Sequence, residues 1–434
     1  MTAIYLTAGV IAFAMAWAIG AQDVSNALGT SVGAKAVTVR QAIYIAGVCE
    51  FLGSLAGGEV AGMISGGILS VDRFIELGDE GVELYSIVMM STMAGAFIWL
   101  AVATYLELPV STTHSLVGAL VGVGTVTLGP SAINFTVITA IVTSWATSPL
   151  LGGAISFIVF SVIHTQILLR ENPRQAVVRV LPHFYGFTGG TSVAFIARVG
   201  PKVLRLSIGK SFFAFLLAYV LTFAVAFHMK VGSGRDSGAT HQNKHKHKHK
   251  NPSNSVKPNS NTTTKANQGN GATSSKLAVT AAAATAAAAA AAAAAEKDLE
   301  DGTVSVEEEA LDNDSNSKKS ESKPRDDIES AFGPLMVVTA CVVSIAHGSN
   351  DVSNAVGPFT AIAHIHSTGQ IPRGGAAPVW VLICGGIGIV AGLGTYGHKV
   401  MATIGEKIAK LTFTRGFAAQ IGTALTVLCA TQVS

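Results

Sequence analysis

Charged residues are scarce in this sequence. Asp, Glu, Lys and Arg make up 13% of the 434 residues, about half of the roughly 25% that soluble domains carry. The charges are also concentrated, since residues 170–250 hold 13 of the 29 Lys and Arg and residues 296–330 hold 13 of the 26 Asp and Glu. Because an ionised group at the centre of a bilayer costs several kcal/mol, the long uncharged stretches in between indicate an integral membrane protein and exclude an ordinary soluble fold.

Cysteine and catalytic motifs are scarce as well. The four cysteines form no CxxC pair, so the pattern indicates packed free thiols rather than a zinc or redox site. The sequence contains no HExxH motif and no glycine-rich phosphate loop. The Lys/His run at residues 241–250 is not interleaved with aromatic residues, which disfavours nucleic acid as a partner. We therefore expect a protein that is not an enzyme and binds no nucleic acid.

Long apolar stretches are abundant. A helix that crosses a bilayer needs about 20 largely apolar residues, and the predicted spans are 3–22, 42–69, 85–106, 133–164, 181–197, 212–229, 332–355, 379–404 and 416–430. Residues 109–128 are also apolar but open with Pro-Val-Ser-Thr-Thr-His, which predicts a broken or re-entrant helix. The predicted fold class is an all-α integral membrane protein.

Residues 231–330 have a different composition. They contain the His/Lys run, an Asn/Ser/Thr-rich stretch, a poly-alanine run and an acidic tail, and this low hydrophobicity predicts a disordered linker. The poly-alanine run at 278–295 is long enough to span a membrane, but alanine is only marginally apolar and a solvated helix is favoured. The linker separates a first transmembrane repeat, 1–230, from a second one, 331–434. The distribution of Lys and Arg places the linker in the cytoplasm.

One polar segment occurs twice. The five residues from Asp23 and the five from Asp351 both read Asp-Val-Ser-Asn-Ala, and each follows an apolar run. A weaker match relates residues 49–57 to residues 384–392. An odd number of crossings between the two copies would invert the second, and inverted repeats with broken helices are typical of secondary transporters, whose site lies between the repeats.

Transport chemistry explains why such residues would lie inside a membrane. An intramembrane Asp needs a partner, and the oxygens of Asp23 and Asn26, three residues apart on a helix, face one side and suit Na⁺. A buried carboxylate could instead hold a proton. A lone Asp-Val-Ser-Asn segment would more often be a helix cap, but its duplication inside apolar sequence favours a functional role.

The segment 109–114 offers the complementary chemistry. A proline followed by Ser111, Thr112 and Thr113 at a helix start presents hydroxyl groups and free backbone N–H groups, which bind anions. His114 is more often a packed residue than a ligand at such a position. Cation ligands and anion ligands in one pocket predict symport, in which each ion lowers the cost of burying the other.

These motifs resemble those of the PiT family of inorganic phosphate transporters. The resemblance rests on the duplicated Asp-Val-Ser-Asn-Ala segment, on residues 109–114, on Ser-Trp-Ala-Thr-Ser-Pro-Leu-Leu-Gly-Gly at 144–153 and on Leu-Thr-Phe-Thr-Arg-Gly-Phe-Ala-Ala at 411–419. It covers most of residues 1–230 and 331–430. The long polar loop between the halves looks like the eukaryotic, mostly sodium-coupled branch.

The resemblance implies a site and partners. The residues that it implies for phosphate are Ser111, Thr112, Thr113, Asn26 and Asn354, and those for the coupling cation are Asp23, Asp351, Asn350, Gln22 and Glu50, with Asp23 and Asp351 as Na⁺ ligands. It implies no cofactor, Na⁺ or H⁺ as the co-transported ion, a homodimer in the bilayer, arsenate as a competitor, and the plasma membrane or an organellar membrane as location.

Three departures from the family pattern bear on function. Gln22 stands where the family has Asn, and Gln420 stands where sodium-coupled members often have Glu. The family also continues past Ser434 with a second hairpin, so the resemblance implies that this chain transports phosphate weakly or not at all. The alternative to a symporter is therefore a non-transporting phosphate sensor or partner, or an inactive fragment.

Overall fold

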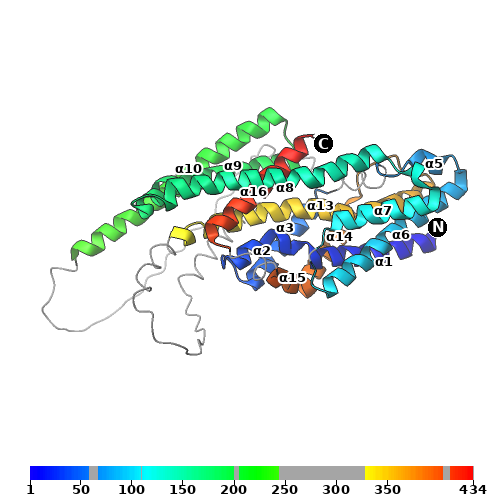
Figure 1. Cartoon of the computed structure of the whole chain (residues 1–434), viewed down its shortest axis with the longest axis horizontal. Helices are drawn as coiled ribbons and strands as arrows, with labels where there is room; N and C mark the ends of the chain where they lie inside the picture. Colours follow the sequence, from blue (N-terminus) through cyan, green and yellow to red (C-terminus); the bar gives the residue numbers. More distant parts are fainter. Residues whose placement is uncertain (58–66, 109, 200–204, 244–327, 404–410, 434) are drawn as a thin grey trace, which may run out of the picture.

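A computed structural model describes residues 1–57, 67–108, 110–199, 205–243, 328–403 and 411–433 (Figure 1). Its helices are α1 (Thr2–Gln22), α2 (Val24–Gly33), α3 (Val39–Ser54), α5 (Val71–Ile75), α6 (Gly78–Tyr105), α7 (Thr112–Leu128), α8 (Phe135–Ile163), α9 (Pro173–Val199), α10 (Ile208–Asn243), α13 (Gly333–Thr368), α14 (Val379–Gly392), α15 (His398–Thr403) and α16 (Phe413–Val433). Within these described ranges the structure contains no β-strand, only one isolated bridge, which confirms the all-α class.

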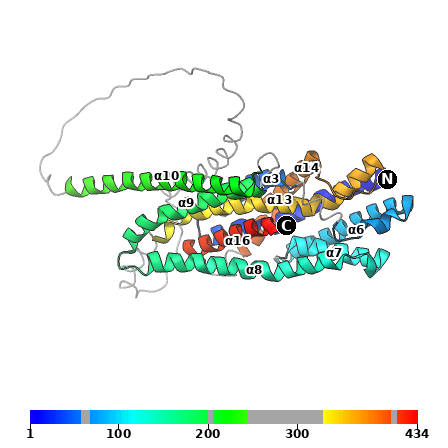
Figure 2. The same cartoon turned by 90° about the horizontal axis from the view of Figure 1, so that it is seen from above.

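The long helix α13 lies in the middle of the molecule in both side views (Figures 1 and 2). Its 36 residues extend about 54 Å at about 1.5 Å per residue. The helices α1, α3, α6 and α14 pack around it, and the main apolar core lies between these five helices. The outer helices α8 and α10 lie on opposite sides of α13 in Figure 2.

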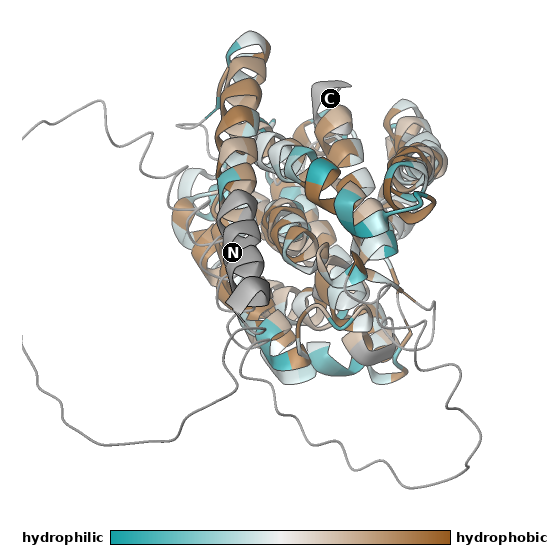
Figure 3. Ribbon diagram, turned by 90° about the vertical axis from the view of Figure 1, so that its left-hand side faces the viewer, coloured by the Kyte–Doolittle hydropathy of each residue, from teal (hydrophilic) through white to brown (hydrophobic). Residues whose placement is uncertain are grey.

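Six helical segments of the described chain are long and apolar enough to cross a membrane: Thr2–Gly33, Gly78–Tyr105, Phe135–Leu168, Ile208–Met229, Ile328–Thr368 and Val379–Met401. The predicted spans at 42–69, 181–197 and 416–430 do not meet this criterion, and α3 has only 16 residues. Large apolar side chains remain exposed on the outer helices α8 and α10, and brown, hydrophobic ribbon predominates in the end view of Figure 3. Lipid is the environment that such a surface requires.

The segment boundaries differ from those that the sequence predicts. The helix α10 continues to Asn243, past the start of the predicted linker at residue 231, while residues 244–327 lie outside the described part. The apolar stretch 42–69 forms a helix only as far as Ser54, and residues 58–66 also lie outside that part.

The two copies of the duplicated segment fold differently. The first lies at a helix break, since α1 ends at Gln22, α2 begins at Val24, and the N–H of Asp23 donates to the carbonyl of Ile19 at 2.8 Å. The second lies in the interior of α13, which continues through Asp351. Both copies therefore follow an apolar run, but only the first stands at the end of a helix.

Helices of the first half pack against helices of the second half at two crossings, and glycines lie at the points of closest approach. In the first crossing, α1 of the first half meets α14 of the second, and Gly20 lies so close to the Ile389 carbonyl that a Cβ would collide with it. Gly392 lies equally close to the Trp17 carbonyl. In the second crossing, α13 meets α3, and Gly348 lies against the Glu50 carbonyl. The two halves are thus in close backbone contact at both crossings.

The glycine contacts also set the register between the repeats. Gly20 and Gly348 hold the same position in the duplicated segment, and the carbonyls that they meet belong to Ile389 and Glu50. The sequence match of 49–57 with 384–392 pairs Glu50 with Gly385 instead. In the structure Ile389 holds the position equivalent to Glu50, four residues or about one helical turn after Gly385. The close backbone contacts of Gly20 and Gly348 determine this alignment.

Replacing Gly53 by valine is expected to destabilise the protein by about 1–3 kcal/mol or more, the usual cost of forcing extra methyl groups into a packed core. Gly53 lies against the Ile345 carbonyl, where a Cβ has no room. Thermal unfolding of the purified protein in detergent measures the effect. The matched control is Gly122→Val on α7, where no atom lies within 4 Å of a Cβ position. Equal melting temperatures for the two variants would contradict the crossing.

Candidate functional site

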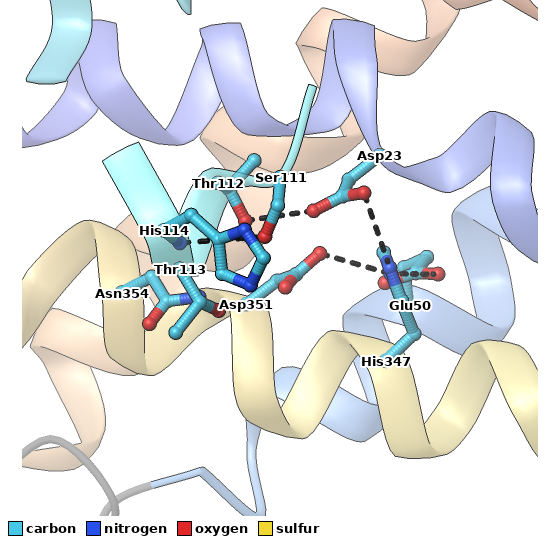
Figure 4. Close-up of polar contacts among 9 residues, drawn as sticks. All are labelled: Asp23, Glu50, Ser111, Thr112, Thr113, His114, His347, Asp351 and Asn354. Atoms are coloured by element: carbon cyan, nitrogen blue, oxygen red, sulfur yellow. Dashed lines mark hydrogen bonds and ion pairs between the residues drawn. The ribbon is translucent and has the colours of Figure 1, made fainter. Parts of the chain in front are cut away.

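Asp23 lies at the break between α1 and α2, where its side chain faces two other helices. Its Oδ2 atom accepts a hydrogen bond from the Thr112 hydroxyl of α7 at 2.7 Å. Its Oδ1 atom lies 3.9 Å from Nε2 of His347 on α13. The side chain is 12% exposed. The break therefore places one carboxylate between the two halves of the chain, within reach of both α7 and α13 (Figure 4).

A second set of ionisable side chains gathers around His347. Its Nδ1 atom lies 2.9 Å from Oδ2 of Asp351, one turn along α13, and 3.2 Å from Oε1 of Glu50 on α3. Glu50 is fully buried, and within the described residues neither of its carboxylate oxygens makes a hydrogen bond of good geometry. Nδ1 of His347 is likewise aligned with neither carboxylate. The cluster thus combines three buried or nearly buried carboxylates with one imidazole, and it has unused acceptor atoms.

This cluster has the composition of a cation site. One ligand atom each from Asp23, His347 and Asp351 lies within 4.8 Å of the other two. Three carboxylates inside a membrane protein carry more negative charge than one imidazole can neutralise, and such groups pair with cations. Carboxylate oxygens are the donors that hard cations prefer. The predicted cation residues Asp23, Asp351 and Glu50 therefore come together in the structure.

Sequence reasoning did not identify His347. The signal was present, because the duplicated segment aligns His347 with Ile19, one position before Gly20. An ionisable residue that replaces an isoleucine within an apolar repeat needs a partner. Glu50, which lies beside His347, shows the same asymmetry. The equivalent position in the first crossing, where the carbonyl faces Gly20, is Ile389. Ile19 and Ile389 are fully buried, so the ionisable pair belongs to one crossing only.

The helix α7 begins where the sequence predicts an anion-binding helix end. Ser111 caps the helix, and its Oγ accepts the His114 N–H at 3.3 Å. Thr112 is fully buried, and Thr113 accepts a hydrogen bond from Nδ2 of Asn354 at 2.9 Å. The 17-residue helix therefore points the N–H groups and positive end of its dipole at the region that Asp23 and Asn354 border (Figure 4).

His114 is a packed residue. Its ring lies against the ring of Trp145 on α8, with centroids 3.8 Å apart. This contact connects the first turn of α7 to one of the outer helices. The interpretation of His114 as packed rather than ligating agrees with this geometry.

Three predicted site residues lie elsewhere or outside the described part of the chain. Gln22 is buried, but its amide donates to the Leu108 carbonyl at 2.8 Å and to Thr104 Oγ1 at 3.4 Å, which ties α1 to the end of α6. Asn350 is exposed, because the uninterrupted helix turns it about 100° away from Asp351. Asn26 belongs to α2, and its side chain lies outside the described part of the structure.

Comparisons with known proteins identify related sequences and a related structure. Residues 19–434 match the model of a family described as the phosphate transporter family. A "putative phosphate permease" of Haemophilus influenzae is 31% identical over 98% of this chain and 82% of its own length. The "inorganic phosphate transporter 2-1, chloroplastic" of Arabidopsis thaliana is 33% identical over 97% of this chain and 61% of its own length.

A solved structure shares the fold. It is described as "The sodium-dependent phosphate transporter", is 31% identical to this chain and superposes with a TM-score of 0.70. The match covers 100% of this chain and 85% of the solved one. The similarity therefore extends over both halves and over the helices that carry the site.

Proposed function

Because the chain belongs to the phosphate transporter family, we propose that it carries inorganic phosphate across a membrane together with a cation, and that this cation is Na⁺ rather than H⁺. Members of this family are transporters, so the expectation that the protein is not an enzyme is confirmed by membership. The chain is a multi-pass integral membrane protein. Na⁺ coupling is supported by the carboxylate cluster and by the similarity to a solved transporter that is described as sodium-dependent.

The observation that carries the proposal is the Thr112–Asp23 hydrogen bond. It joins the first turn of α7, an anion-binding helix end, to the carboxylate that borders the cation cluster. An anion bound at α7 would lie beside a cation bound between Asp23 and Asp351. Each ion lowers the electrostatic cost of burying the other, and this mutual dependence is the coupling free energy of a symporter.

The proposal assigns a role to each predicted site residue. Ser111, Thr112, Thr113, Asn26 and Asn354 bind phosphate, and Asp23, Asp351 and Glu50 bind or neutralise the cation. Gln22 positions α1 against α6, and Asn350 contributes only if α13 rotates or unwinds locally. We further propose a homodimer in the plasma membrane, with arsenate as a competing substrate.

The test is radiolabelled phosphate uptake into proteoliposomes of this chain, with and without an inward Na⁺ gradient at fixed pH. Uptake that the Na⁺ gradient stimulates and a proton gradient does not would support Na⁺ symport. Binding of radiolabelled phosphate to the purified protein without uptake would support the alternative, a sensor or partner protein. A folded protein that neither binds nor transports phosphate would contradict the proposal.

Competing oxyanions provide a separate prediction. Arsenate is expected to inhibit phosphate binding at about equal concentration, because it matches phosphate in shape, charge and protonation. Sulfate is expected to bind about 10–100-fold more weakly, because it is dianionic without a proton to donate to Asp23 or Asp351, and an acceptor placed against an acceptor loses the charge-assisted hydrogen bond. Competition against radiolabelled phosphate at constant Na⁺ measures both. Sulfate that competes as well as arsenate would show that neither Asp accepts a hydrogen bond from the substrate.

A further inference from the structure

Two of the four cysteines meet where α3 of the first half crosses α13 of the second. Cys49 lies on α3 and Cys341 on α13, and both are free thiols buried in the main apolar core. The Cys49 thiol donates a hydrogen bond to the sulfur of Cys341. The other two cysteines, Cys384 on α14 and Cys429 on α16, are exposed. A buried pair of thiols thus connects two segments that are far apart in the sequence.

The backbones beside this pair are in close contact. A Cβ atom on Gly53, one turn after Cys49, would lie 3.1 Å from the Cα atom of Ile345, one turn after Cys341. The Cα atoms of Gly53 and Ile345 are therefore within about 5 Å of each other. One turn later, Gly57 lies against the next turn of α13. The first segment thus follows α13 in one direction and in a constant register, which makes Cys49 face Cys341.

This geometry suits a disulfide bond. Residues joined by a disulfide have Cα atoms about 4.4–6.8 Å apart, and the contact between Gly53 and Ile345 shows that the two backbones approach each other this closely one turn away. Two thiols in hydrogen-bonding contact reach the S–S bond length of about 2.05 Å by rotation of their side chains. Oxidation of the pair therefore requires no sliding of one helix past the other.

We propose that Cys49 and Cys341 form a redox-active pair, which a small neutral oxidant such as hydrogen peroxide converts to a disulfide between the two halves. In the first step, one thiol reacts with hydrogen peroxide to give a sulfenic acid and water. In the second step, the other thiol attacks the sulfenic sulfur, the S–S bond forms, and the sulfenic hydroxyl leaves with the thiol proton as a second water. The pair loses two electrons and two protons, and the peroxide is reduced to water.

Burial determines which reagents reach the pair. Cys49 is 9% exposed and Cys341 is 5% exposed, so a bulky thiol reagent such as a maleimide should label Cys384 and Cys429 and leave the pair unmodified. A single buried cysteine is usually inert. The second thiol distinguishes this pair, because it captures the sulfenic acid before further oxidation.

The disulfide would connect the two helices that carry Glu50 and His347. Glu50 follows Cys49 directly on α3, and His347 lies on α13 in contact with it. The cross-link would close a loop of roughly 300 residues, and cross-links of long loops restrict the unfolded chain most. Oxidised protein is therefore expected to melt about 5 °C or more above reduced protein.

The experiment tests whether oxidation joins the two halves covalently. Full-length protein in detergent, with a protease cleavage sequence inserted between residues 244 and 327, is treated with a maleimide, oxidised with hydrogen peroxide and then cut. Oxidised native protein should run at full length on a denaturing gel without reductant and as two fragments with dithiothreitol. Cys49→Ser and Cys341→Ser should each give two fragments under both conditions. The matched control, Cys384→Ser with Cys429→Ser, should cross-link as native protein does.

Two fragments from oxidised native protein would overturn the proposal, as would a cross-link that is lost in the control variant. Mass spectrometry covers the case in which a serine variant does not fold, because it needs only the native protein. Digests of the oxidised protein without reductant should contain a pair of peptides joined through Cys49 and Cys341, and reduced protein should contain the same peptides unjoined. Absence of this pair would also overturn the proposal.

Thermal unfolding tests whether the disulfide forms in the described geometry. The rise in melting temperature on oxidation should be present in native protein and absent from Cys341→Ser. A cross-linked protein that melts no later than reduced protein would show that the bond distorts the crossing, and it would contradict the proposal. Since none of these measurements uses phosphate, an absence of phosphate binding or uptake would contradict the proposed function and leave the thiol pair standing.

Discussion

Replacing Asp23 or Asp351 by asparagine is expected to lower Na⁺-driven phosphate uptake by about 100-fold, equivalent to roughly 3 kcal/mol and near the upper end of the usual coupling free energy between two binding sites. Asparagine keeps the volume of the side chain and removes its charge. In Asp23→Asn one oxygen becomes an N–H₂ group, which cannot accept the Thr112 hydroxyl or ligate a cation. In Asp351→Asn the carboxylate beside His347 is lost.

Measurements of thermal stability distinguish this loss of uptake from misfolding of the variants. Three carboxylates lie around one imidazole, so in the absence of Na⁺ the removal of one negative charge relieves repulsion. Both variants are therefore expected to melt no earlier than native protein in choline chloride, and to lose the additional stability that NaCl gives native protein. Melting curves in the two salts, together with uptake, measure both effects.

The control is Asp72→Asn, which removes a carboxylate far more exposed than those of the site. Asp72 pairs with Arg373 at 2.9 Å, and its side chain is 68% exposed, where an ion pair contributes about 1 kcal/mol or less. Uptake by this variant should stay within about threefold of native. If Asp23→Asn or Asp351→Asn keeps the native response to Na⁺, the carboxylates are not the cation ligands.

The sequence predicts the chemistry of the site better than its geometry. The duplicated segment identifies Asp23 and Asp351 because repetition inside apolar sequence is improbable without a function. It does not predict that α1 breaks at Asp23 while α13 continues through Asp351, since both segments have the same five residues. That difference depends on the helices packed around each copy, and it leaves Asn350 exposed.

The contact between α3 and α13 explains why the sequence did not identify His347 and did not predict the position of Glu50. A lone histidine in an apolar segment has many structural roles, and its partner Glu50 lies on α3, far away in the sequence. The match of 49–57 with 384–392 places Glu50 opposite Gly385, whereas the glycine contacts place it opposite Ile389. Register of this kind is set by backbone contacts between distant segments, which composition and periodicity do not contain.

The asymmetry between the two crossings leads to the second large effect. Glu50→Gln is expected to raise the Na⁺ concentration for half-maximal phosphate uptake by about 10-fold or more, because it removes one of three negative charges from a buried cluster. Phosphate affinity at saturating Na⁺ is expected to stay within about threefold of native, because Glu50 contacts His347 and neither Thr112 nor Asn354. Uptake measured over a matrix of Na⁺ and phosphate concentrations separates the two effects.

A double substitution tests whether Glu50 acts through His347. If the two side chains work as one unit, Glu50→Gln combined with His347→Gln should change the Na⁺ response no more than the larger single effect, since contacting residues are not additive. The control for the lost charge is Glu83→Gln on the exposed face of α6, which should respond to Na⁺ as native protein does. A Glu50→Gln protein with weakened phosphate binding and an unchanged Na⁺ response would show that Glu50 acts on phosphate binding and not on Na⁺ binding. Coupling to Na⁺ would then depend on Asp23 and Asp351 alone.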